Sequence, residues 1–326
     1  MITLGIETSC DETAAAVAED GRVLSSEVSS SVHLHSRHGG VVPEIASRYH
    51  TEYIYPVLLK ALDDSGKSIA DIDLVAVTKS PGLPGSLLVG IAFAKAVALA
   101  AGKPIVGVDH VQAHVLSSFL GGGAGRAEAD FPILGMVVSG GHTSIYLCKS
   151  FTEYEQIGGT KDDAVGEAFD KVAKIMGLGY PGGPLIEKRA ASYNGEDVIA
   201  FPRALIREEG GLDFSFSGLK TAVMYYWKKC DRSEAEMDKI AFSFQEAVID
   251  VILRKALRAA DITGIRTIAV GGGVIHNAEL RSRLVSGCAE SGITLSLPGR
   301  EYCADNAAMI AVLGQELYVK GKGRHV

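Results

Sequence analysis

The sequence has few cysteines, and none of them forms a pair typical of a zinc ribbon or of a small disulfide framework. There are five, they lie far apart, their number is odd, and none belongs to a CxxC motif. This usage excludes a fold held together by disulfides and fits a reducing compartment. We therefore expect a cytoplasmic protein. The cysteines are Cys10, Cys148, Cys230, Cys288 and Cys303.

A long apolar run is also missing. The longest, residues 87–101, is interrupted by Lys95 and is shorter than the ~20 residues that a membrane-spanning helix needs. We expect a buried helix here and no association with a membrane. The first residues, MITLGIETSC, have neither the basic nor the apolar segment of a signal peptide, which again predicts a cytoplasmic protein.

The chain has no excess of positive charge. Its 32 Lys and Arg residues face 39 Asp and Glu residues, which gives a formal net charge of −7. Proteins that bind nucleic acid unaided usually have a basic surface. Any contact with RNA must therefore use a local patch or the surface of a partner.

Length and composition predict two globular domains. The 326 residues are 47% hydrophobic and 22% charged, which is ordinary for a folded soluble chain. A pattern of three short strands followed by helical crossovers begins at residue 2, with strands expected at 14–18 and 22–28 and a hairpin turn at Asp20-Gly21 between them. The pattern begins again at residue 133. We expect two α/β lobes, residues 1–125 and 126–304, divided at the glycine-rich stretch Gly121–Gly125. The last helix, within about 305–326, is expected to pack on the first lobe.

Two histidines have the spacing of metal ligands. His110 and His114 are four residues apart, so on a helix both imidazoles lie on one face. A zincin-type protease would need Glu where this chain has Val111. A third ligand is required, and Asp305, at the start of a predicted helix, is the candidate. The alternative is that the two histidines only cap or pack their helix.

The segment Gly5–Thr13, GIETSCDET, ends a predicted strand in small polar residues and two carboxylates. Such a turn can present N–H groups to a phosphate, while Asp11 or Glu12 accepts a proton or binds a metal. A plain hairpin with two solvated acids is the alternative.

Two glycine-rich turns follow later strands. The first is formed by Val137, Val138, Ser139, Gly140 and Gly141. Without Cβ atoms its backbone can approach an anion closely, although a simple hairpin would have the same sequence. The second, Gly271–Gly273, precedes a helix that begins near Asn277. It is not a dinucleotide-binding GxGxxG motif, and it suits a turn beneath an adenine ring, or a tight strand–helix connection.

An acidic helix and a rigid turn are further candidates for ribose binding. In DDAVGEAFDK (162–171), Asp170 is a carboxylate that can bind ribose hydroxyls. The following YPGGP (180–184) contains Gly183 and predicts a turn with free backbone N–H groups. The alternative is a solvated acidic face followed by the end of a helix.

Together these motifs closely resemble one family over nearly the whole chain. GIETSCDET, the two histidines, VSGGHT, DDAVGEAFDK, YPGGP and GGGVIHN occur in the order and spacing of the TsaD (Gcp/YgjD) family. GGVVPEIASR (39–48), PGLPGSLLVG (81–90), FSFSGLKT (214–221) and the run from Cys303 to Met309 match as well. These proteins are tRNA N6-adenosine threonylcarbamoyltransferases. The resemblance implies an α/β fold of two ribonuclease-H-like lobes, the actin/Hsp70/sugar-kinase (ASKHA) fold, with a nucleotide cleft between them.

The resemblance also implies roles for individual residues. His110, His114 and Asp305 match ligands of one divalent metal ion, usually iron and sometimes zinc. The turn Val137–Gly141 matches contacts to the substrate. Three further matches are Asp170, Gly183 and Asn277, and a fourth falls at Glu187, where many relatives have Asp.

The implied reaction is the transfer of threonylcarbamoyl from threonylcarbamoyl-AMP to N6 of adenosine 37 in the anticodon loop. The tRNAs are those that read codons beginning with A, and the products are the modified nucleoside t6A and AMP. The exocyclic amine is a poor nucleophile, so positioning and charge stabilisation should provide the catalysis. Asp11 or Glu12 would take the proton. Bacterial relatives work with the inactive paralogue TsaB and the ATPase TsaE.

Two other functions share the predicted fold. A small-molecule kinase would bind Mg²⁺ through carboxylates and water, which the histidine pair disfavours. A nucleotide-gated scaffold without chemistry is the second alternative. The helix at about 43–63 has apolar Ile45, Tyr49, Tyr53, Val57 and Leu58 at helical spacing. This pattern is more often core, although it could extend into an interface with the paralogue.

Overall fold

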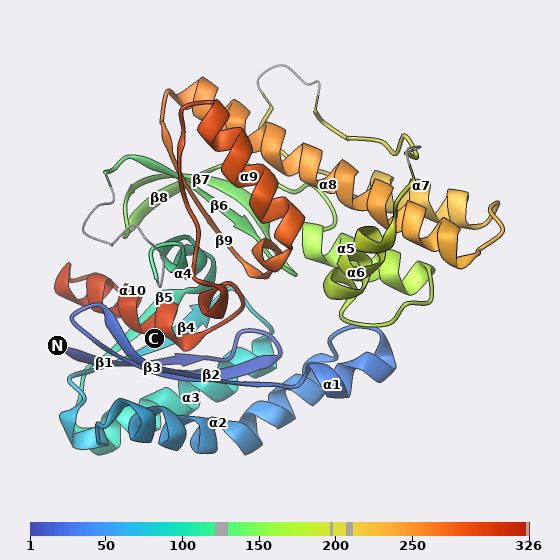
Figure 1. Ribbon diagram of the computed structural model, residues 1–326. Helices are drawn as coiled ribbons and strands as arrows, with labels where there is room; N and C mark the ends of the chain where they lie inside the picture. Colours follow the sequence, from blue (N-terminus) through green and yellow to red (C-terminus); the bar gives the residue numbers. More distant parts are fainter. Residues whose placement is uncertain (121–129, 196–197, 207–210, 324–325) are drawn as a thin grey trace. The chain divides into compact units, whose positions relative to one another are not determined.

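The computed structural model describes residues 1–120, 130–195, 198–206, 211–323 and 326. The boundary expected at Gly121–Gly125 lies outside these residues. The chain forms two compact units (Figure 1). The first contains the described residues before 121, the short segment Phe151–Glu153 and the C-terminal segment from Asp305 onward, and the second contains most of the remainder.

The first unit is built on a five-stranded sheet in the order β3-β2-β1-β4-β5. Neighbours β1–β2 and β2–β3 are antiparallel, whereas β4 runs parallel to both β1 and β5. A tight turn at Asp20–Gly21, with positive φ at both residues, joins β2 to β3 as the sequence predicts. The strands are β1 Ile2–Glu7, β2 Glu12–Glu19, β3 Arg22–Ser30, β4 Leu74–Ser80 and β5 Ile105–Asp109.

Helices cover both faces of this sheet (Figure 1). Helices α2 and α3 pack on one face, and α4 and α10 lie on the other. The approach of α10 to β1 is close, because a Cβ on Gly5 would lie 2.3 Å from the carbonyl oxygen of Ala307. The bounds are α1 Val32–His35, α2 Pro43–Ser65, α3 Pro84–Ala101, α4 His110–Ser117 and α10 Ala307–Val319.

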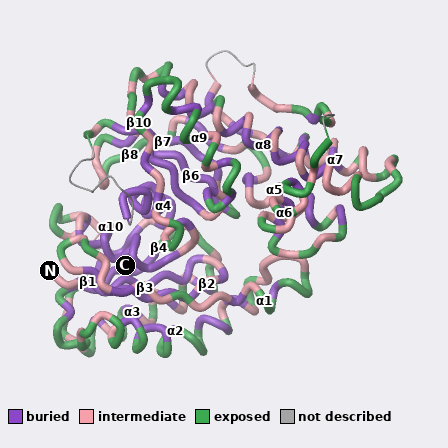
Figure 2. Tube along the Cα trace, viewed as in Figure 1, coloured by how far each residue is buried: buried purple, intermediate pink, exposed green. Residues whose placement is uncertain are grey.

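The second unit repeats the strand order of the first. Its sheet runs β10-β9-β6-β7-β8, with β6–β7 antiparallel and β6–β9 and β9–β10 parallel. Strand β6 is buried along its whole length (Figure 2). The repeat predicted from the sequence is therefore present in the backbone. The strands are β6 Ile133–Val138, β7 Thr143–Ser150, β8 Glu153–Gly159, β9 Thr267–Gly271 and β10 Thr294–Ser296.

Most helices of the second unit pack around one apolar core. Phe169, Phe214, Phe216 and Phe244 are buried in it, and the long helix α8 contributes more of its aliphatic side chains than any other element. A short 3₁₀ helix, Gly273–His276, connects β9 to α9. The helices are α5 Val165–Ile175, α6 Gly182–Ser192, α7 Ser217–Trp227, α8 Glu234–Thr263 and α9 Ala278–Glu290.

The expectation of a buried helix at residues 87–101 is wrong. Only one stripe of α3 is buried, formed by small residues such as Gly90, Ala94 and Ala98, while Leu88 and Leu99 are 68% and 85% exposed. By length and composition α3 is apolar enough to cross a membrane, but it packs on α2 and β4 as part of the first unit. The apolar composition of α3 did not show which side of the helix packs against the sheet.

Candidate functional site

Helix α4 places two histidines on one face of the first unit. The chain leaves β5 at Asp109, whose carboxylate accepts a hydrogen bond from the backbone N–H of Gln112 at 2.9 Å and so begins the helix. His110 and His114 follow one helical turn apart. Both are buried, and their rings meet edge to face with centroids 4.6 Å apart.

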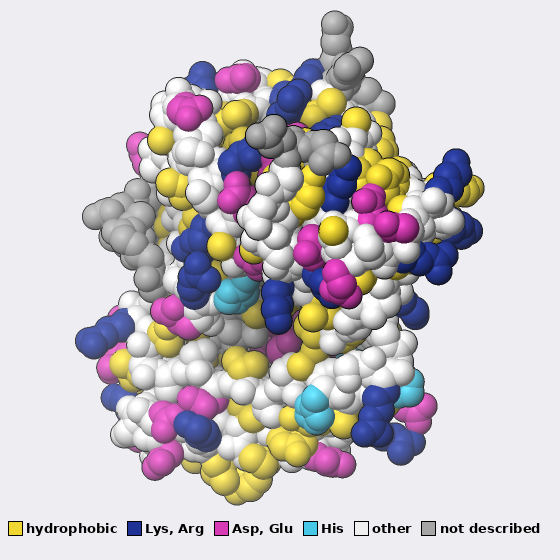
Figure 3. Space-filling model, turned by 45° about the vertical axis from the view of Figure 1, so that its right-hand side comes forward, with side chains coloured by type: hydrophobic (Ala, Val, Ile, Leu, Met, Phe, Trp, Pro, Cys, Tyr) yellow, Lys and Arg dark blue, Asp and Glu magenta, His cyan; other side chains and the backbone are white. Residues whose placement is uncertain are grey.

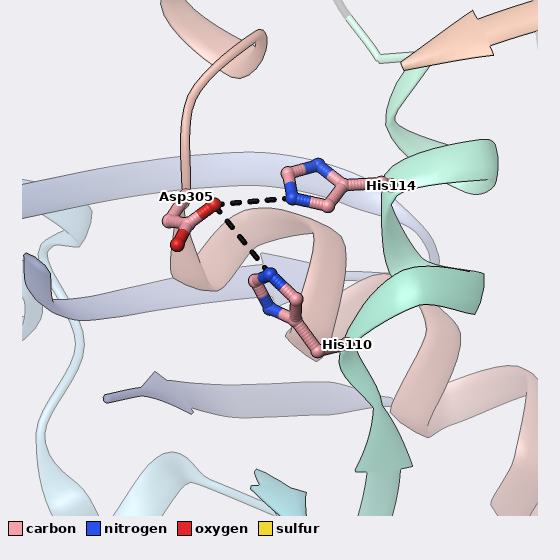
Figure 4. Close-up of side chains that lie close together, drawn as sticks. All are labelled: His110, His114 and Asp305. Atoms are coloured by element: carbon pink, nitrogen blue, oxygen red, sulfur yellow. Dashed lines mark hydrogen bonds and ion pairs between the residues drawn. The ribbon is translucent and has the colours of Figure 1, made fainter. Parts of the chain in front are cut away.

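Asp305 completes the group from the segment that leads into α10. Its Oδ1 lies 3.1 Å from His114 Nε2 and 3.6 Å from His110 Nε2. Figure 4 shows both rings directing the same nitrogen at this one carboxylate. The structure therefore brings together the three residues that the sequence predicted as ligands, although Asp305 is 191 positions from His114.

These three residues fit a transition-metal ion. Their donor atoms all lie within 4.8 Å of one another. An ion with bonds of about 2.1 Å would separate its ligands by roughly 3.0–3.4 Å, close to the two distances seen here. Two imidazoles and one carboxylate suit iron or zinc better than magnesium. The group leaves further coordination positions for a substrate or water, as a catalytic site requires.

A buried carboxylate supports His110 from behind. Glu7, the last residue of β1, has an Oε2 atom 3.0 Å from His110 Nδ1 and receives a 2.5 Å hydrogen bond from the Thr78 hydroxyl. Burial opposes the charge of each partner. However, the His110 charge and hydrogen bond lower the pKa of Glu7, while Asp305 and Glu7 raise the pKa of His110 to about 9. Without an ion, the ring and the two acids form a charged cluster.

The β1–β2 turn carries Asp11 and Glu12, and contacts with the two ring nitrogens of His50 hold it in place. His50 Nδ1 lies 2.7 Å from the Thr13 hydroxyl, and Nε2 lies 3.0 Å from the carbonyl oxygen of Cys10. Burial, together with the nearby charge of Asp11, raises the pKa of Glu12 well above its usual value. The turn is therefore a fixed part of the first unit, and burial there favours the protonated form of Glu12.

The turn Val137–Gly141 joins β6 to β7 in the second unit. It is a hairpin closed at its base, because Ser139 N–H donates to the His142 carbonyl at 2.8 Å and the Ser139 hydroxyl accepts from His142 N–H at 3.1 Å. A Cβ on Gly140 or Gly141 would meet nothing within 4 Å, and neither residue has positive φ. Neither packing nor backbone conformation requires these two glycines, so their open side is available to a ligand.

The glycine turn after β9 packs against this hairpin. A Cβ on Gly272 would lie 2.4 Å from the carbonyl oxygen of Val138, and Gly272 has φ of +102°. Gly273, the next residue, faces open space. The structure thus places the two turns side by side in the second unit.

Asp170 contacts the start of α6, the helix in which Gly183 is the second residue. Asp170 Oδ1 accepts a 2.7 Å hydrogen bond from the backbone N–H of Gly182, so the expectation that the N–H groups of this turn are free is wrong at Gly182. A Cβ on Gly182 would also lie 2.5 Å from the carbonyl oxygen of Phe169, whereas a Cβ on Gly183 would meet nothing. Gly182 serves packing, and Gly183 leaves space.

Asn277 and Glu187 meet at the start of α9. Asn277 caps the helix, since its Oδ1 accepts from Leu280 N–H at 2.9 Å, and its amide donates to Gln245 Oε1 at 2.7 Å. Glu187 Oε1 accepts from Ala278 N–H at 2.7 Å. The side chains of both predicted contacts therefore have partners within the protein.

Glu7 is the residue that the sequence analysis missed. It lies inside the GIETSCDET motif, but only Asp11 and Glu12 were considered as functional acids. The available signal was an ionisable residue within an otherwise apolar strand, because a buried carboxylate needs a partner.

Comparisons with known proteins agree with this geometry. The family TsaD, described as tRNA N6-adenosine threonylcarbamoyltransferase, matches residues 22–312. A relative of that name from Kosmotoga olearia is 48% identical, covering 98% of this chain and 94% of its own length. Another from Syntrophus aciditrophicus is 47% identical over 100% of this chain and 95% of its own.

Solved structures show the fold alone. HypF from T. kodakarensis aligns with a TM-score of 0.63 at 14% identity, and the alignment covers 98% of this chain but 48% of HypF, so this chain spans about half of that protein. The ROK hexokinase from Thermus thermophilus aligns with a TM-score of 0.53 at 15% identity, over 98% of this chain and 100% of the hexokinase. They confirm the predicted two-lobed α/β fold of the ASKHA type.

Proposed function

Because this chain belongs to the tRNA N6-adenosine threonylcarbamoyltransferase family and is an acyltransferase, we propose that its donor is threonylcarbamoyl-AMP and its acceptor is N6 of adenosine 37. The tRNAs would be those that read codons beginning with A, and the products t6A and AMP. The observation that carries this proposal is the convergence of His110, His114 and Asp305 within a chain of this family.

The reaction needs positioning more than it needs a strong nucleophile. AMP is a good leaving group from a mixed anhydride, whereas the exocyclic amine of adenosine is weakly nucleophilic. Holding the carbonyl carbon and the amine in attacking geometry is worth several kcal/mol. A flipped or splayed loop base can be presented in this way, because loop bases are already unpaired.

The second unit supplies the adenylate contacts in this proposal. Gly140, Gly141 and Gly183 leave open backbone where a phosphate or ribose can approach. Asp170, whose Oδ1 accepts from Gly182 N–H at the start of α6, would bind ribose hydroxyls through its carboxylate. Asn277 and Glu187 would contact the nucleoside from the start of α9, where hydrogen bonds to the helix backbone hold both side chains. In this proposal residues 126–304 form the lobe that binds the adenylate, and residues 1–125 form the other lobe together with the last helix.

The first unit supplies the threonyl contacts. His110, His114 and Asp305 would hold one iron or zinc ion, which would bind the threonyl carboxylate and stabilise negative charge. The two buried rings fix the donor atoms, since neither side chain has room to turn away. Iron is the first choice because the family resemblance implies it.

The proton of the attacking amine needs an acceptor, and Glu12 is our choice over Asp11. Its pKa is raised well above the usual value by burial and by Asp11. A carboxylate whose pKa is raised toward the working pH is a stronger base, and so a better proton acceptor, than a carboxylate with the usual pKa of its kind. Asp11 would then maintain the shift through its charge.

Partner proteins should supply much of the RNA-binding surface, since the chain itself carries a net charge of −7. We propose the paralogue TsaB and the ATPase TsaE as partners in the cytoplasm, without a membrane. The helix pattern at 43–63 is largely core, because Tyr49, Val57 and Leu58 are buried. Hydrophobic side chains nonetheless gather at the bottom of the view in Figure 3, and the exposed large ones on α2 and α3 are Tyr53, Tyr55, Leu59, Leu88 and Leu99. This α2–α3 face is the proposed paralogue interface.

The test is reconstitution with threonylcarbamoyl-AMP, unmodified tRNA and the partners. We expect t6A in the digested tRNA and an equal amount of AMP. His114→Ala and Asp170→Ala should each lower the rate by about a hundredfold or more. Glu290→Gln, an exposed substitution on α9, is the control and should act as wild type.

The outcomes separate the competing functions. Absence of the modified nucleoside, or wild-type rates in both variants, would contradict the transferase assignment. Phosphorylation of a small molecule in the same mixture would favour a kinase. The metal content of His110→Ala can be measured without any turnover. In a variant with both His110 and His114 replaced, a full complement of ion would refute the ligand assignment.

A further inference from the structure

We propose that Glu7 is a positioning residue that fixes His110 in the single ring form able to present Nε2 to a metal ion. This inference rests on the proposed metal site and concerns how the site is prepared. Glu7 does not approach Asp305 as a ligand would. It acts on the opposite side of the His110 ring, through Nδ1.

The Glu7 carboxylate is itself held without freedom to turn. The residue is 0% exposed at the end of β1. Its Oε1 accepts a short hydrogen bond from the backbone N–H of Ser9. Its Oε2 receives the Thr78 hydroxyl at 2.5 Å and faces His110 Nδ1 at 3.0 Å. The turn after β1 therefore fixes Oε1, and β4 and the start of α4 fix Oε2.

The arrangement selects a tautomer. An ionised carboxylate can only accept hydrogen bonds, so His110 Nδ1 must be the ring nitrogen that carries a hydrogen. A neutral imidazole has one N–H, which leaves the lone pair on Nε2. That nitrogen is directed at Asp305 Oδ1, 3.6 Å away, where an ion would bind. A carboxylate behind a histidine ligand also makes the ring a stronger base.

The other histidine lacks such a partner. In the part of the chain that the structure describes, His114 Nδ1 is buried without a hydrogen bond. The Ser9 hydroxyl lies 3.2 Å from His110 Nδ1, but a hydroxyl can donate or accept and so selects no ring form. Of these contacts, the one from Glu7 therefore selects a ring form, and it acts on His110.

The substitution Glu7→Gln tests this directly. In the glutamine side chain only the amide oxygen can face the Ser9 N–H, because an NH₂ group there would place two hydrogen-bond donors against each other. The NH₂ group must then face His110 Nδ1 and donate to it. The ring hydrogen would move to Nε2, the nitrogen that should bind the ion. We expect Co²⁺, used as the probe, to bind about 10–100-fold more weakly than to wild type.

Thr78→Val is the matched control. It removes one hydrogen bond from the same Glu7 oxygen with little change of volume, yet leaves the carboxylate facing His110. We expect a similar loss of thermal stability but a change in Co²⁺ affinity well below tenfold. Equal weakening in both variants would mean that Glu7 acts only through packing, and wild-type affinity in Glu7→Gln would overturn the proposal.

A measurement on the wild-type protein keeps the test decisive if Glu7→Gln fails to fold. In protein with ¹⁵N-labelled histidine and bound Zn²⁺, the His110 ring should show a hydrogen on Nδ1 and the ion on Nε2. The reverse pattern would overturn the proposal. Neither assay uses threonylcarbamoyl transfer, so the inference can fail while the proposed reaction stands. Wild-type protein that binds neither ion would refute the metal site as well.

Discussion

Asp162 binds Ser217 through both of its carboxylate oxygens. Oδ1 accepts from the Ser217 backbone N–H at 3.1 Å, and Oδ2 accepts from the Ser217 hydroxyl at 2.7 Å. Phe216 N–H and the Ser215 hydroxyl donate to the same carboxylate. The capping residue of α7, Phe216, has no side-chain acceptor of its own. A residue more than fifty positions away therefore caps this helix.

This cap predicts a dependence of stability on acid. Burial opposes ionisation of Asp162, but the hydrogen bonds from Ser215 and Ser217 lower its pKa from 3.8 to about 2. A carboxyl group with a lowered folded-state pKa stabilises the protein above about pH 4 and loses this effect as the pH falls toward 2. Because the side chain is exposed, screening limits the contribution to about 1–2 kcal/mol.

Urea unfolding of wild type and Asp162→Asn at several pH values would measure this contribution. We expect the difference in unfolding free energy to be largest at neutral pH and to shrink below pH 4. Ser215→Ala, which removes one of the donors, should cost less than Asp162→Asn. A difference that stays constant from pH 7 to pH 3 would show that the charge of Asp162 is not involved.

His50 holds the turn that carries Asp11 and Glu12. Its ring accepts from Thr13 and donates to the Cys10 carbonyl, so His50→Ala should cost about 2–4 kcal/mol of unfolding free energy. Burial lowers the pKa of His50 below 6.5, although the hydrogen bond to Cys10 opposes this. The stabilisation is therefore complete above about pH 6.5 and is lost as the pH falls through the lowered pKa.

Thermal unfolding between pH 5 and pH 8 checks the His50 prediction. The wild-type melting temperature should fall toward pH 5, and the difference from His50→Ala should shrink there. Thr13→Val, which removes the hydroxyl at nearly constant volume, should reproduce part of the loss at neutral pH. A variant as stable as wild type at pH 8 would contradict the role given to this ring.

Local sequence signals predicted most of the helices and strands, and they predicted the shared face of two of the three candidate metal ligands. The strand alternation and the Asp20–Gly21 turn placed β2 and β3 closely, because side-chain period and positive φ are local properties. The spacing of His110 and His114 predicted a shared face for the same reason. Asp305 was found as the one acid at the start of a helix in a motif of the family. The closeness of Asp305 to the two histidines depends on the fold, and no local pattern in the sequence shows it.

Interactions between distant segments account for what could not be predicted. Glu7 meets His110 across two strands, and no spacing in the sequence links them. Asn277 and Glu187, predicted as substrate contacts, also form hydrogen bonds at the start of α9, and no local pattern indicated those bonds. The exposure of Leu99 depends on which stripe of α3 the sheet covers, and an apolar helix gives no periodic signal for that.

The α2–α3 face predicts where the paralogue binds. Leu88 and Leu99 are exposed to 68% and 85%, so charged substitutions there should leave the fold intact. If the face is the interface, Leu99→Arg and Leu88→Glu should each weaken the complex by about tenfold or more. Titration calorimetry with the purified paralogue would measure this. Val285→Arg, at a residue of α9 that is 51% exposed, is the control, and unchanged affinity in both test variants would contradict the assignment.

Two neighbouring glycines separate packing from ligand binding. A Cβ on Gly182 would lie 2.5 Å from the carbonyl oxygen of Phe169 and 2.6 Å from the Cα of Asp170, atoms of the backbone that cannot move aside cheaply. Gly182→Ala should therefore lower the unfolding free energy by about 1–3 kcal/mol. A Cβ on Gly183 meets nothing, and alanine favours a helix, so Gly183→Ala should be as stable as wild type or slightly more stable.

The same pair tests the adenylate contact. If the open side of Gly183 faces the ligand, its methyl group should weaken AMP binding by about tenfold, a loss near 1.4 kcal/mol, while the melting temperature stays at or above that of wild type. Gly182→Ala should show the reverse order, with a clear loss of stability and, in the fraction that remains folded, a smaller change in affinity. Calorimetric titration with AMP below the melting temperature of both variants would measure this. Wild-type AMP affinity in Gly183→Ala would show that Gly183 does not line the AMP site. Wild-type stability in Gly182→Ala would refute the packing argument, because a buried methyl group cannot occupy space that the backbone of α5 already fills.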